Sequence, residues 1–153
     1  MKSTRSWRRA LAALLLIQTF SVPAFAALGG NLSSIEEDQL KMKGTLRTTV
    51  GERYTVHEIQ TSQGTLVREY VAPSGVVFAV AWRGPKMPDL RQTLGNYFTQ
   101  FTDAPRPLHP NHAHFAMSEP NLVLQSSGHM RAYSGRAYDP RLLPADVPVT
   151  DIQ

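Results

Sequence analysis

Apolar and polar positions alternate most regularly in the middle of the chain. Three runs, YTVHEIQT (54–61), TLVREYVA (65–72) and VVFAVAWR (76–83), are rich in β-branched and aromatic residues, which favour strands. Short segments that contain glycine separate the runs and are typical of turns. The pattern predicts an antiparallel meander. Because the third run is apolar on both sides, we expect it to lie centrally in the sheet.

A helical period follows the meander. The large apolar side chains of DLRQTLGNYFTQF (89–101) recur at intervals of three and four residues, which places them on one side of a helix. These side chains are Leu90, Leu94, Tyr97, Phe98 and Phe101. The segment therefore predicts one amphipathic helix, capped by Asp89 and packed on one face of the sheet.

A shorter helix is expected ahead of the strands, in SSIEEDQLKMKG (33–44). Ser34 and Glu37 have the spacing of a capping box, and Gly44 can close the helix. The segment ALGGN (27–31) before it predicts a flexible leader.

The end of the chain predicts a hairpin and then a tail. NLVLQSSGHMRAYSGRAY (121–138) contains one or two strands, with turn signals at 127–128 and 134–135, and residues 139–153 are expected to be extended. Together these elements predict an α+β fold in a single domain, residues 27–153. It consists of an antiparallel sheet of about four to six strands, one amphipathic helix on a face, and a C-terminal hairpin.

The N-terminus has the three parts of a secretory signal peptide. Four basic residues and no acid precede Ala10, an apolar run of 11 residues follows, and SVPAFA ends in an A-x-A site. We expect cleavage after Ala26, which places the protein in the periplasm or outside the cell. The apolar run is shorter than the roughly 20 residues of a membrane span, so no span is expected in the mature chain.

Removal of residues 1–26 changes the charge of the protein. The whole chain has 16 Lys and Arg against 12 Asp and Glu, and the signal holds four of the basic residues and none of the acids. The mature chain therefore has 12 of each. A neutral chain without a basic run argues against a nucleic-acid partner. Cysteine is absent, so the fold must be held by burial rather than by disulfides.

Three of the five histidines lie in HPNHAHF, within a Pro- and His-rich loop predicted over residues 102–120. His112 and His114 point to the same side of an extended backbone, and His109 could supply a third imidazole to one metal ion. No Cys, Asp or Glu lies inside the cluster to complete a tetrahedral set. A solvent-facing loop without a metal therefore remains the simpler interpretation.

Arg and Tyr recur in GHMRAYSGRAY (128–138). If Ser134–Gly135 forms a turn, Arg131, Tyr133, Arg136 and Tyr138 cluster at the end of a hairpin. These residue types dominate protein–protein hot spots, so the cluster is a candidate partner site, and Trp82 is a further candidate residue for it. The alternative is that both tyrosines pack on the sheet while the arginine stems cover its edge. No nucleophile elbow, dinucleotide fingerprint or phosphate-binding loop is present in the sequence.

Four blocks of the sequence carry a resemblance to a known family. ALGGNLSS, the meander from residue 54 to residue 85, DLRQTLGNYF and GHMRAYSGRAY resemble, in order and spacing, a proteobacterial family of exported proteins of unknown function, DUF2844. The resemblance implies export and a single domain, and it brings no catalytic residue, cofactor or substrate.

The leading hypothesis is a non-enzymatic module of the cell envelope that binds another envelope or secreted protein through residues 128–138 and Trp82, without a cofactor. The alternative hypothesis is a metal-binding protein that uses His109, His112 and His114. A small hydrolase with a dispersed site is a third possibility.

Overall fold

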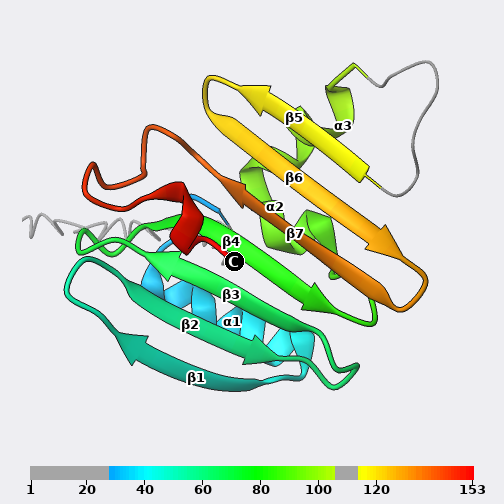
Figure 1. Ribbon diagram of the computed structural model, residues 1–153. Helices are drawn as coiled ribbons and strands as arrows, with labels where there is room; N and C mark the ends of the chain where they lie inside the picture. The colour runs from blue at the N-terminus through cyan, green and yellow to red at the C-terminus, as the bar shows by residue number, and fades with distance from the viewer. Residues whose placement is uncertain (1–27, 106–113) are drawn as a thin grey trace, which may run out of the picture.

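The computed structural model describes residues 28–105 and 114–153 as a seven-stranded antiparallel sheet with helices on one side (Figure 1). The order across the sheet is β1-β2-β3-β4-β7-β6-β5. The strands are β1 (Thr45–Val50), β2 (Thr55–Gln60), β3 (Leu66–Val71), β4 (Val77–Gly84), β5 (His114–Glu119), β6 (Leu122–His129) and β7 (Ala132–Tyr138). We call the side with the helices the back face and the other side the front face.

The predicted meander is confirmed, and the sheet is larger than expected. The three predicted runs form β2, β3 and β4, and each pairs with the next in antiparallel register. β4 lies in the middle of the sheet and is buried from Val77 to Trp82. A second meander, β5-β6-β7, joins the first through the β4–β7 pair.

The segment predicted as one helix over 89–101 is broken. It forms α2 (Leu90–Leu94), a 3₁₀ turn η1 (Gly95–Tyr97) and α3 (Phe98–Asp103). Gly95 adopts φ 52° and ψ −121°, a left-handed conformation that glycine reaches without a Cβ clash, and it ends α2 there. Asp89 caps α2 as expected, because its side chain accepts from the Arg91 backbone N–H at 2.9 Å.

The helices contribute to the core on the back face. Fully buried Leu94 of α2 and Ile35 of α1 (Leu32–Met42) belong to the same cluster as Val80 of β4 and Leu124 of β6. The other apolar side chains of the predicted stripe pack against this cluster: Leu90, Tyr97, Phe98 and Phe101. Figure 1 shows α1 behind β1–β3, and α2 behind β6 and β7. None of the helices in the described part of the chain is long and apolar enough to cross a membrane.

The chain before α1 differs from the predicted flexible leader. Leu28 is buried, and Gly29 N–H donates to the Val77 carbonyl at 2.8 Å. The predicted capping box is not formed either, because α1 begins at Leu32 and the buried Ser34 hydroxyl donates to the Asn31 carbonyl. At the other end Lys43, rather than Gly44, adopts the left-handed conformation.

The last segment, expected to be extended, crosses the front face and forms a second core. It contains the 3₁₀ turn η2 (Val149–Asp151), and its Val147 and Ile152 side chains are buried with Phe78 and Tyr70 of the sheet. Figure 1 shows this segment in red, in front of β3 and β4. The central strands are therefore covered on both faces.

The turns predicted at 127–128 and 134–135 are both wrong. Ser127–Gly128 lies within β6. Ser134–Gly135 lies in the middle of β7, and the hairpin turns at Met130–Arg131, where Arg131 has φ 65°. The loop predicted over 102–120 ends earlier than expected, because residues 114–119 form β5 and pair with β6. Ser-Gly is common in turns, but here Gly135 is required for packing. It lies opposite Trp82 of β4, whose indole ring occupies the space that a Cβ would need.

We predict that Gly135→Ala lowers the free energy of unfolding by about 1–3 kcal/mol, since the added methyl would overlap the Trp82 ring in a packed core. Urea unfolding of Gly135→Ala, Trp82→Phe and the double variant measures this cost. The smaller Phe ring should accommodate the methyl, so the cost of Gly135→Ala should fall in the Trp82→Phe background. Equal costs in both backgrounds would contradict the ring as its cause.

Candidate binding face

The C-terminal segment divides the front face of the sheet into a covered part and an open part. Arg136 Nη1 on β7 donates to the carbonyls of Val149 at 2.9 Å and Ile152 at 3.2 Å. From the other side, Arg68 Nη1 on β3 donates to the Gln153 carbonyl at 2.7 Å. The segment is therefore held by two arginines across β3 and β4. It also covers Tyr138 at the end of β7, and the front of β5, of β6 and of the rest of β7 is left open.

A depression of about 500 Å³ lies on this open part. Its lining mixes polar and apolar residues and comes from β4, β5, β6 and β7 and from the end of the C-terminal segment. We call six of these side chains the polar face: Arg83, His114, Gln125, Ser127, Ser134 and Arg136.

Strand register brings the polar face together. Ser134 of β7 pairs with Arg83 of β4 on one side and with Ser127 of β6 on the other. Ser127 in turn pairs with His114 of β5, so these four residues form one row across the sheet. Since alternate residues of a strand share a face, Gln125 and Arg136 form a second row beside the first.

Several of these side chains hold one another in place. Arg136 Nε donates to Gln125 Oε1 at 3.0 Å, and the hydroxyls of Ser127 and Ser134 are 3.1 Å apart. Arg83 is exposed, and it has no hydrogen-bond or ion-pair partner among the described residues. The face thus combines ordered groups with a guanidinium that is available to a ligand.

The charged side chains that line the depression are basic. Among the described residues, its lining includes Arg83 and Arg136 and no Asp or Glu. The His114 ring lies beside that of His129, with 6.3 Å between the ring centroids. Guanidinium groups bind carboxylates and phosphates well because two parallel N–H bonds can form. The geometry of the polar face therefore suits an anionic group.

The structure separates the residues that the sequence grouped as a partner site. Arg136 lies on the polar face, and Tyr138 packs in the front core beneath the C-terminal segment. Trp82 is buried in the back core, and its Nε1 has no partner among the described residues. Arg131 and Tyr133 line another hollow, of about 450 Å³, which Arg83 also borders. The four Arg and Tyr side chains therefore do not form one cluster.

The histidine loop is only partly described. His109 and His112 lie outside the described residues, and His114 is the exposed first residue of β5. Within residues 28–105 and 114–153, no group of three or more His, Asp or Glu side chains could hold a metal ion.

Two buried carboxyl groups, Asp38 and Glu69, lie between α1 and β3. The carboxyl groups of Asp38 and Glu69 interact with each other, and Asp38 Oδ1 accepts from Gln92 Nε2 of α2 at 2.8 Å. Asp38 Oδ2 and Glu69 Oε2 are buried and accept from no donor among the described residues. Burial raises the pKa of Asp38 to about 6 and that of Glu69 well above its usual value. We infer that Glu69 keeps its proton at neutral pH. Nearby on β2, burial lowers the pKa of His57.

This pair predicts a pH dependence of stability. A carboxyl whose pKa is raised by folding stabilises the protein fully below its unfolded pKa, and this contribution is lost as the pH rises through the folded pKa. We expect Glu69→Gln, which keeps a donor toward Asp38 without a charge, to be more stable than the unsubstituted protein at pH 8. The difference should shrink toward pH 4, by up to about 1.4 kcal/mol per pH unit.

Urea unfolding between pH 4 and pH 8 measures this difference, and the exposed Glu119→Gln on β5 is the matched control. A difference that does not change with pH would argue against the retained proton.

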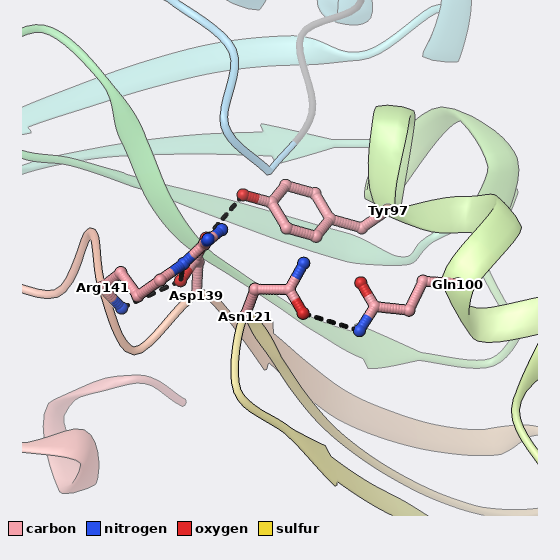
Figure 2. Close-up of polar contacts among 5 residues, drawn as sticks. All are labelled: Tyr97, Gln100, Asn121, Asp139 and Arg141. Carbon is pink, nitrogen blue, oxygen red and sulfur yellow. Dashed lines mark hydrogen bonds and ion pairs between the residues drawn. The ribbon is translucent and has the colours of Figure 1, made fainter.

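A third buried acid, Asp139, accepts hydrogen bonds from three kinds of donor (Figure 2). Its carboxylate accepts from Tyr97 Oη at 2.6 Å, from the Arg141 backbone N–H at 2.8 Å, and from Arg141 Nε and Nη2 at 3.0 and 2.6 Å. Burial opposes ionisation, but these hydrogen bonds outweigh it and lower the pKa of Asp139. Burial and the contact with Asp139 raise the pKa of Tyr97 to about 12.

The Tyr97–Asp139 contact ties η1 to the start of the C-terminal segment. Beside it, Gln100 Nε2 donates to Asn121 Oδ1 at 2.7 Å, which ties α3 to the β5–β6 turn (Figure 2). This cluster belongs to the architecture, since Asp139 is completely buried and no reacting group could reach it.

We predict that Tyr97→Phe lowers the free energy of unfolding by about 1–3 kcal/mol, because the buried Asp139 carboxylate would lose a donor. Denaturant unfolding at pH 7 measures the loss. Tyr133→Phe is the control, since the Tyr133 hydroxyl has no hydrogen-bond partner among the described residues. Comparable losses in the two variants would refute a specific role of the Tyr97 hydroxyl.

Comparison with known proteins identifies a family and nothing more specific. The sequence model of a family described as a protein of unknown function (DUF2844) matches residues 24–152. No curated protein and no solved structure matches the chain.

Proposed function

The chain belongs to the DUF2844 family, whose description assigns no activity, and we propose that it is an exported binding protein. In this proposal the polar face holds an acidic, extended segment of another envelope or secreted protein. The observation that carries the proposal is the cationic lining, in which Arg83 is exposed and unpaired among the described residues.

A polypeptide ligand is favoured because the front face already binds one in cis. Arg136 and Arg68 donate hydrogen bonds to backbone carbonyls of the C-terminal segment. The open part of the face offers the same kind of donors, together with the Ser127 and Ser134 hydroxyls and the Gln125 amide. An extended segment could therefore lie beside the C-terminal one, with its acidic side chains toward Arg83.

Binding is favoured over catalysis by the placement of the perturbed acids. Paired carboxyl groups with raised pKa values are typical of acid–base sites. Here Asp38 of α1 and Glu69 of β3 are at most 1 % exposed, so a substrate has no access to them. The polar face itself contains no carboxyl group that could act as a general acid or base.

Export is part of the proposal and rests on the sequence. Residues 1–26 have the basic start, the short apolar run and the A-x-A site of a signal peptide. Cleavage after Ala26 would release a neutral mature chain into the periplasm or the medium, where acidic segments of other exported proteins are accessible.

We predict that the mature chain binds a fluorescein-labelled polyglutamate peptide and does not bind polylysine. Fluorescence anisotropy at low salt measures the affinity, which should fall as salt is added. Arg83→Glu should weaken binding by about tenfold or more, or about 1.4 kcal/mol. Arg47→Glu on β1 is the matched control, because Arg47 is also exposed on the front face but lies beyond the C-terminal segment.

The proposal is refuted if polyglutamate does not bind, or if Arg83→Glu and Arg47→Glu weaken binding equally. It includes no cofactor, so EDTA should leave the affinity unchanged. Loss of binding in EDTA, restored by zinc, would instead support the metal hypothesis built on His109, His112 and His114.

A further inference from the structure

The edge strand β5 offers a surface that the proposed function does not use. Among the described residues, its outer side pairs with no other strand. The strand runs in unbroken register against β6, without a bulge, and it carries no proline and no charged residue between His114 and Glu119. Natural proteins protect edge strands with such features, and an edge without them accepts another strand.

The side chains of β5 show how another strand would fit. Phe115 and Met117 point to the back face, pack against the core and remain half-exposed. Phe115 also meets Phe101 of α3 edge to face, with ring centroids 5.5 Å apart. On the front face, Ala116 and Ser118 are small and exposed, so a neighbouring backbone can approach closely.

We propose that two copies of this chain associate through β5, antiparallel about a two-fold axis that passes midway between the Ala116 residues of the two copies. This register places Phe115 opposite Met117 of the second copy, and each side chain would cover apolar surface that the other leaves exposed. It also places His114 opposite Ser118, so no like charges face each other. A two-fold axis perpendicular to the sheet keeps residues of the same face together, as an isologous interface requires.

A second copy is the occupant that these observations favour. The pattern Phe115-Ala116-Met117 complements itself when it is reversed about its centre, whereas an unrelated strand would have to match it by chance. Electrostatics do not oppose the contact, because the mature chain has 12 basic and 12 acidic residues. The opposite edge, β1, differs because exposed Arg47 lies in its middle.

The absence of cysteine makes the register directly testable. Directly opposed residues of antiparallel strands have Cα atoms about 4.5–5.5 Å apart, a distance that a disulfide can span. We expect Ala116→Cys to form a disulfide-linked dimer under mild oxidation, seen on a non-reducing gel and reversed by reductant. Thr49→Cys, exposed on the other edge strand, is the matched control and should remain monomeric.

A mixing experiment tests the position of the axis. Ser118→Cys alone should crosslink weakly, because its partner in the second copy is His114. An equal mixture of Ser118→Cys and His114→Cys should give the crosslinked dimer. Sedimentation of the unsubstituted chain should show a dimer that dissociates on dilution, since the edge of one strand is a small interface.

The inference is overturned if Ala116→Cys stays monomeric, or if Thr49→Cys crosslinks equally well. If Ala116→Cys stays monomeric while polyglutamate protects the β5 amides from hydrogen exchange, the occupant of the edge is a peptide and not a second copy. The crosslinking needs no ligand, so failure of the anion-binding proposal would leave this result unchanged.

Discussion

The burial of β4 on both faces is the constraint on which the rest of the structure depends. Every residue from Val77 to Trp82 is at most 2 % exposed, so the strand needs a covering layer on each side. On the back face that layer comes from α1 and α2, which contribute Ile35 and Leu94. On the front it comes from the C-terminal segment, which is only wide enough to cover the centre of the sheet. The front of β5, β6 and β7 consequently remains in contact with solvent and carries polar side chains.

Local patterns predicted the strands, whereas the contacts between distant segments could not be read from them. β2, β3 and β4 follow directly from runs of β-branched and aromatic residues, and the spacing of Leu90 to Phe101 identified the side chains that reach the core. The break at Gly95 was missed because glycine in a helical pattern is compatible with either a kink or a continuous helix. Ser134–Gly135 was misread because Gly135 is required by the indole of Trp82, which is more than fifty residues away.

In the candidate site, too, single residues could be predicted from the sequence, whereas their contacts with distant residues could not. Arg136 was predicted to bind a partner, and it does line the depression, but its neighbours Gln125 and Ser127 are brought to it only by the β6–β7 register. Asp139 and Arg141 are two residues apart, so their contact could have been anticipated from the sequence. The Asp38–Glu69 contact joins α1 to β3, and no local signal marks it. The environments of these buried acids act in opposite directions: hydrogen-bond donors lower the pKa of Asp139, whereas burial raises the pKa of Glu69.

The polar face extends to β5, which is also the edge strand through which we propose that two copies pair. A two-fold axis perpendicular to the sheet leaves the front faces of both copies on the same side. Pairing through Ala116 would therefore join two polar faces into one cationic surface, with His114 of each copy near its centre. An acidic segment long enough to cross the axis could contact both copies. Its second contact would then be intramolecular and favoured by a high effective concentration. A weak anion-binding face and a weak edge contact would strengthen each other, because ligand that bridges two copies stabilises the pair.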